Sequence, residues 1–157
     1  MVLAASVSCV AADEIKIGIV NTERVMRESA PAIEAQKKIE KEFASRDLNL
    51  QKMAKQAKDL QAQLDKEGMA LLETDRAAKE RDLANLSRDF QRMQREFRED
   101  LNLRKNEELA AVIEKANKAI IGIAQSEKYD LILQEAVYRS PKIDITDKVI
   151  RALANEK

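Results

Sequence analysis

Histidine and cysteine, two residue types that carry much enzyme chemistry, are scarce in this sequence. It contains no histidine and a single cysteine, Cys9, so it offers no imidazole base and no cysteine–histidine set for zinc. The adjacent carboxylates Glu107 and Glu108 are candidates for an acid pair or a metal site. On an amphipathic helix, however, such side chains are normally solvated or paired with Lys and Arg one turn away. We therefore expect a protein that is not an enzyme and that needs no cofactor.

Charged side chains are the groups that remain for binding. Basic residues are interleaved with acids in the middle of the chain, and they could attract acidic groups of a client protein or lipid headgroups. The alternative is that they form only the solvated face of a helix. Lys plus Arg equals Asp plus Glu, 28 of each, and this balance argues against a dedicated nucleic-acid binder. The basic candidates are Arg92, Arg95, Arg104 and Lys105.

These basic residues belong to a helical stretch that occupies most of the chain. Residues 32–125 contain no proline and only two glycines, Gly68 and Gly122, and they are rich in helix-favouring residues. Apolar residues recur in steps of three and four over long tracts, which is typical of a coiled coil rather than an ordinary surface helix.

The two halves of this stretch match each other in reverse. If the chain folds back near Gly68, the apolar residues of one half face those of the other. We therefore predict an antiparallel hairpin of coiled-coil arms over residues 31–109, with its tip near 67–74. Toward the tip the facing positions become polar, so the arms should be loosely joined there. The predicted pairs are Ile39 with Leu101, Phe43 with Phe97, Leu50 with Phe90, Met53 with Leu86 and Ala57 with Leu83.

The β-strand signals lie at the two ends of the chain. Residues 16–21 and 129–133 are short β-branched or aliphatic runs, and residues 136–138 predict a third strand. We predict an α+β fold in which residues 13–30 and 110–157 form a small β-rich body with a C-terminal helix. Three short strands leave exposed edges and a marginal core, so this body should associate with further copies. The residues assigned to that contact are Ile17, Ile19, Leu131, Ile132 and Leu133.

The N-terminus has the features of an export signal. Residues 1–12 are apolar and rich in small residues, and Val10-Ala11-Ala12 before Asp13 is similar to a signal-peptidase site. An ordinary disordered N-terminus is the alternative. Cleavage after Ala12 would leave a chain without cysteine, which suits an oxidising compartment.

Several short motifs follow one another in a fixed order along nearly the whole mature chain. They are residues 16–21, Phe43 with Leu60, Phe90 and Phe97 with 106–108, residues 129–133, 136–140 and 144–146. In this order they resemble the Skp (OmpH-like) family of periplasmic chaperones.

The resemblance implies a periplasmic holdase that keeps unfolded outer-membrane β-barrel proteins from aggregating without ATP. It implies a homotrimer whose helical arms enclose a client cavity. A basic cluster proposed in the family to contact lipopolysaccharide is matched here by Arg104, whereas Met93 and Leu103 replace other basic positions. Arg92 and Arg95 lie nearby in the sequence.

Two other functions fit a hairpin of this kind. One is a prefoldin-like cytosolic chaperone subunit, which would lack an export signal. The other is a structural coiled-coil scaffold that holds no client protein.

Overall fold

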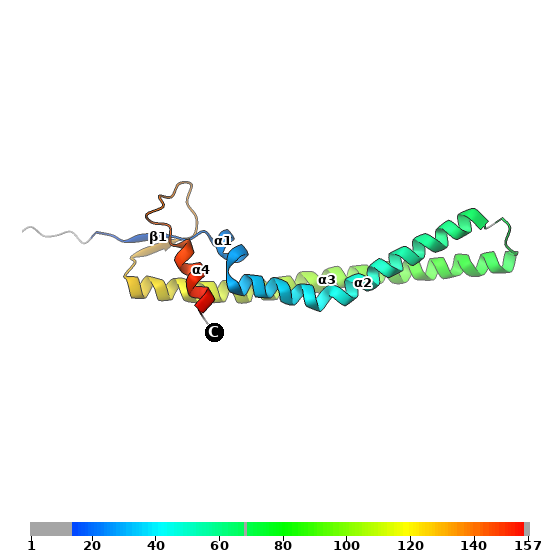
Figure 1. The fold of residues 1–157 in the computed structure, drawn as a ribbon, viewed down its shortest axis with the longest axis horizontal. Helices are drawn as coiled ribbons and strands as arrows, with labels where there is room; N and C mark the ends of the chain where they lie inside the picture. The colour runs from blue at the N-terminus through cyan, green and yellow to red at the C-terminus, as the bar shows by residue number, and fades with distance from the viewer. Residues whose placement is uncertain (1–13, 68, 156–157) are drawn as a thin grey trace, which may run out of the picture. The chain divides into compact units, whose positions relative to one another are not determined.

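The computed structural model describes residues 14–67 and 69–155 (Figure 1). The elements are β1 (Ile17–Ile19), α1 (Thr22–Glu28), α2 (Ala30–Glu67), α3 (Glu73–Glu127), β2 (Leu131–Leu133) and α4 (Thr146–Asn155). This arrangement confirms the predicted α+β class, with two long helices, a small sheet and a C-terminal helix. The segment predicted as a signal peptide, residues 1–12, lies outside the described residues.

The chain divides into two compact units. Among the described residues, one unit comprises 14–30 and 114–155, and the other lies within Pro31–Ile113. The second unit is the hairpin of α2 and most of α3, whereas α3 continues to Glu127 and so contributes to both units.

Helices α2 and α3 begin and end where the sequence chemistry changes. Pro31 lies in the first turn of α2, where its missing N–H costs no intrahelical hydrogen bond. Helix α2 ends at Glu67 and α3 begins at Glu73, so the turn between them includes the one glycine of this region. Glu73 and Asp75 in the first turn of α3 complement the positive end of the helix dipole.

Strands β1 and β2 form a two-stranded parallel sheet. Ile17 pairs with Leu131 and Ile19 with Leu133. Between them, Gly18 permits a close approach: an added Cβ would lie 3.2 Å from Ile145 Cδ1 and 3.2 Å from a Tyr129 ring carbon. Glycine therefore lets the sheet lie directly on the aromatic ring and the core.

The prediction of a third strand at residues 136–138 is wrong, because these residues form a loop after β2. The second edge of β1 is occupied by a different segment. Ile19 N donates to Ile143 O at 2.8 Å, and Ile145 N donates to Ile19 O at 2.9 Å. Ile145 is buried, whereas Val137 and Tyr138 are exposed. Core burial therefore selects the later segment for the edge.

The core of the first unit is small and draws on both chain ends and on α3. Its largest fully buried side chains come from the segment after β1, from α1 and from α4. Asn21 joins these parts, because its Oδ1 accepts from Arg24 N at 3.0 Å and its N–H donates to Thr146 Oγ1 at 2.9 Å. The buried cluster is Val20, Val25, Ala116, Ala119, Ile145, Val149 and Leu153.

Candidate functional site

The hairpin's own aromatic side chains close the seam between α2 and α3. Phe43 is 6% exposed, and its ring meets that of Phe97 edge to face, with centroids 5.5 Å apart. This contact confirms the predicted pairing. Arg46 lies over both rings and forms an ion pair of 2.8 Å with Asp100. The charge of Arg46 at the seam is thus satisfied by a carboxylate and by cation–π contacts.

Arg104, one of the predicted contact residues, lies in an ion cluster that crosses from α3 to α2. It contacts Glu42 of α2 at 3.0 Å, Glu107 at 2.8 Å and Glu108 at 2.7 Å. Lys38 of α2 reaches Glu108 at 2.6 Å. Hydrogen bonds to Glu107 and Glu42 raise the pKa of Arg104. The adjacent carboxylates considered for acid or metal chemistry are therefore engaged by cations, and Arg104 helps to join the two helices.

The other predicted basic contacts differ in availability. Arg92 contacts Asp89 at 3.1 Å and Glu96 at 3.6 Å within its own helix. Arg95 and Lys105 are exposed and make no ion pair within the described residues. Positions 95 and 104 are nine residues apart on α3, about 14 Å along the helix axis. The four side chains therefore form two separate sets rather than one cluster.

The five residues predicted for oligomer contact divide between the two faces of the sheet. Ile132 packs against the buried cluster on one face, whereas Ile19 lies on the other face and is nevertheless only 3% exposed. Ile17, Leu131 and Leu133 are 37%, 48% and 40% exposed, and they share the opposite face from Ile132 because side chains alternate along a strand. We call these three residues the sheet patch. It leaves apolar area in contact with water.

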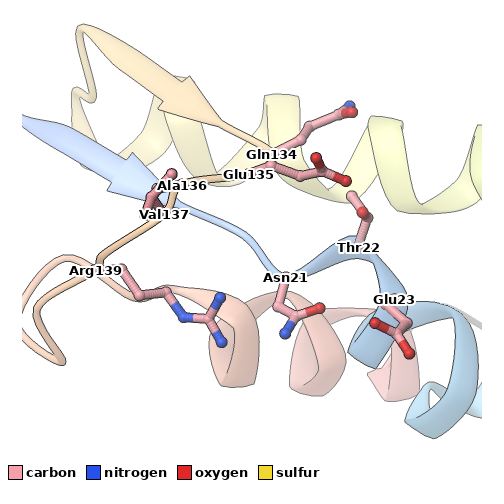
Figure 2. A pocket seen from close by; sticks show the side chains of 8 residues that line it. All are labelled: Asn21, Thr22, Glu23, Gln134, Glu135, Ala136, Val137 and Arg139. Atoms are coloured by element: carbon pink, nitrogen blue, oxygen red, sulfur yellow. The ribbon is translucent and has the colours of Figure 1, made fainter.

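The loop after β2 adds further apolar surface to this unit. Val137 and Tyr138 are both highly exposed. An open pocket of about 470 Å³ lies between this loop and the start of α1. Figure 2 shows the side chains that line it. Arg139 borders the pocket and is held by Asp144 at 2.9 Å. The pocket is lined by Asn21, Thr22, Glu23, Gln134, Glu135, Ala136, Val137 and Arg139.

Sequence reasoning missed a charged cluster that ties three elements together. Lys16 Nζ donates to the backbone carbonyl of Glu127 at 2.7 Å and lies 4.1 Å from the centroid of the Tyr129 ring. Lys148 of α4 contacts the Glu127 carboxylate at 2.6 Å. Hydrogen bonding to Lys148 lowers the pKa of Glu127. Lys16 and Glu127 are 111 positions apart, and no local spacing signals such a contact.

The described parts of the chain contain no group of three or more His, Cys, Asp or Glu arranged to hold a metal ion. Within the same residues, no helix combines the length and the apolar character that a membrane crossing requires. The described residues do offer exposed apolar and charged surfaces.

Comparison with known proteins identifies the class to which these features belong. The family model described as outer membrane protein (OmpH-like) matches residues 16–153. A solved structure from Caulobacter crescentus CB15, described as an OmpH-like outer membrane chaperone, superposes with a TM-score of 0.73 at 16% identity. The superposition covers 91% of this chain and 86% of that chain, and it shows a shared fold.

Curated relatives agree with this assignment. The chaperone protein Skp of Escherichia coli K12 is 30% identical over 152 residues, covering 95% of this chain and 91% of the relative. Skp of Pectobacterium atrosepticum is 28% identical over 153 residues, covering 96% and 92%. The chain therefore belongs to the Skp (OmpH-like) family of chaperones. None of these matches favours the prefoldin-like or scaffold alternatives.

Proposed function

We propose that this protein is an ATP-independent periplasmic holdase that binds unfolded outer-membrane β-barrel proteins and prevents their aggregation. Membership of the Skp family supports a chaperone role. Unfolded barrel strands alternate apolar and polar residues, so they expose apolar surface and aggregate readily. A holdase for such chains must offer many weak contacts rather than one specific pocket.

The observation that carries this proposal is that the apolar residues of the hairpin are divided between the seam and the exposed surface. The large aromatic residues close the seam, whereas Leu48 and Leu103 are 51% and 61% exposed on the outer surfaces of α2 and α3. Single exposed leucines separated by charged residues suit weak contacts with many sequences. Several such contacts acting together hold a client more tightly than any one of them.

We further propose that the protein acts as a homotrimer with the client in a cavity enclosed by the arms of three copies. The sheet patch and the exposed Val137 and Tyr138 supply apolar surface for the contact between copies. These residues fit an interface because exposed apolar side chains lose contact with water when two copies associate.

Electrostatic contacts with a client or with lipopolysaccharide would rely mainly on two of the four predicted basic residues. Arg95 and Lys105 are exposed and free of ion pairs within the described residues, whereas Arg92 and Arg104 already contact carboxylates. Because the chain has no net charge at pH 7, long-range attraction to an anionic surface is weak. Charge therefore assists client binding and does not dominate it.

The test measures light scattering while an unfolded outer-membrane protein is diluted out of denaturant with the chaperone present. A shortened variant removes residues 51–89 and joins Leu50 to Phe90 by a short turn, so that the Phe43–Phe97 contact remains. We expect this variant to lose protection while its far-ultraviolet circular dichroism and assembly mass show that it still folds and associates. Full protection by the shortened variant would contradict the proposal.

A charge-reversal variant tests the electrostatic part of the proposal by itself. Arg95→Glu with Lys105→Glu should weaken protection a few-fold at low salt and little at about 0.15 M salt, where exposed charges are largely screened. The matched control is Lys41→Glu with Lys55→Glu, which makes the same charge change at exposed positions on α2. Equal losses in both variants would mean that total charge, not these two residues, affects binding.

A further inference from the structure

The tip of the hairpin contains a groove that the chaperone proposal does not use. Its volume is about 430 Å³, and it opens between the last turns of α2 and the first turns of α3. The helices leave this space because the facing side chains near the tip are polar: Lys79 Nζ donates to Gln63 Oε1 at 3.1 Å. The groove is lined by Gln61, Leu64, Asp65, Met69, Arg76, Glu80, Leu83 and Ala84.

Apolar side chains lie both inside this groove and beside it. Leu64 and Leu83 line it, and they are only partly exposed. Met69, which also borders the groove, is 102% exposed, and Leu72 in the same turn is 73% exposed. Two large apolar residues in such full contact with water at a turn provide anchoring surface for another polypeptide.

The charge around these apolar residues is negative. Residues 64–75 contain four carboxylates, those of Asp65, Glu67, Glu73 and Asp75, against one ammonium group, that of Lys66. Arg76 contacts Glu73 at 3.2 Å and Glu80 at 3.5 Å, so it offsets part of this negative charge, but two carboxylates share its one guanidinium group. The carboxylates of Glu67 and Asp75 make no ion pair within the described residues. The tip is thus acidic although the whole chain is neutral.

We propose that this tip is a docking site for a cationic amphipathic segment of another polypeptide. An aliphatic or aromatic side chain of that segment would enter the groove beside Met69, and flanking Lys or Arg residues would face Asp65 and Glu67. Anionic lipid is a poor occupant because the tip would repel its headgroups. A second tip is equally unsuitable because it carries the same charge. This inference goes beyond client holding, and its test needs no client to bind.

Fluorescence anisotropy of the full chain with labelled peptides tests this proposal. The probe is a short peptide with lysines flanking a central pair of leucines, and two matched peptides carry glutamate for lysine or serine for leucine. We expect the lysine–leucine probe to bind at low salt and both matched peptides to bind at least about fivefold more weakly, because each exposed contact contributes modestly.

Two variants test whether the probe binds at the tip. Asp65→Asn with Glu67→Gln should weaken the probe about fivefold, and so should Met69→Ser with Leu72→Ser, since all four side chains are exposed and the helices stay intact. The controls are Glu34→Gln with Glu99→Gln, and Leu109→Ser with Ile121→Ser, at exposed positions along the helices.

Each outcome decides the proposal. Losses confined to the tip variants support it. Equal losses in tip and control variants, or no binding of the probe at all, overturn it. Binding of phosphatidylglycerol vesicles that is lost in the tip variants would also overturn it, in favour of a membrane contact.

Discussion

At the scale of single residues, Asp144 joins the edge of the sheet, the start of α4 and the loop after β2. Its carboxylate accepts from the N–H of Thr146 at 2.9 Å and contacts Arg139 at 2.9 Å. Burial alone would raise the pKa of Asp144, but the hydrogen bonds from Thr146 and the charge of Arg139 outweigh it, so the pKa is lowered from 3.8. The folded protein therefore favours the ionised form.

This lowered pKa predicts how stability depends on pH. A carboxyl group with a lower pKa in the folded state contributes stability above its unfolded pKa of 3.8, and that contribution is lost as the pH falls through the folded value. Asp144→Ala should cost about 1–3 kcal/mol at pH 7 because it leaves Thr146 without its partner. Asp144→Asn should cost less. Both variants should lose less stability than the wild type below about pH 3.8, measured by urea unfolding at fixed protein concentration. Parallel profiles for all three proteins would contradict this role.

At the scale of elements, the hairpin depends on contacts that cross from α2 to α3. The Phe43–Phe97 contact and the Arg46–Asp100 ion pair both cross from α2 to α3, and Arg46 lies over both rings. The cluster around Arg104 adds ion pairs of 3.0 Å and 2.6 Å between the helices. Apolar and ionic contacts thus specify one alignment of the two helices.

A double-mutant cycle on Phe43 and Phe97 tests this register. Phe43→Ala should destabilise the protein by about 3 kcal/mol, because the side chain is 6% exposed. The coupling between the two substitutions should be about 1 kcal/mol, as for other edge-to-face pairs. A control cycle on Phe43 and Phe90, about 10 Å apart along the seam, should be additive within about 0.5 kcal/mol. Equal coupling in both cycles would mean that no specific ring pair fixes the register.

The sequence predicts the hairpin better than the sheet, for a physical reason. Heptad spacing repeats many times along α2 and α3, so Phe43 and Phe97 can be paired by aligning whole tracts. Residues 136–138 form too short a run to show which strand they would pair with. Their strand propensity is outweighed by the burial of Ile145, whose segment bonds to Ile19 instead. The ion pairs of Arg104 were not predicted, because the sequence of a charged helix face does not show which side chains contact a neighbouring helix.

At the scale of the whole molecule, we propose that association depends on the sheet patch. Leu131→Asp should dissociate the assembly, because a carboxylate buried without a partner costs several kcal/mol. Leu103→Asp is the matched control, since it makes the same change at a more exposed leucine on the hairpin, and it should leave the assembly intact. Sedimentation velocity distinguishes these results. An intact assembly in the Leu131→Asp variant would exclude the sheet patch from the interface.

The central claim is that several copies of this chain together hold one unfolded outer-membrane protein. Native mass spectrometry of the chain, with and without such a client and without ATP, tests this claim most directly. The account predicts a mass of three copies alone and three copies plus one client after mixing, with the client lost when residues 51–89 are removed. A mass unchanged by the client, or equal client capture by the shortened variant, would contradict it.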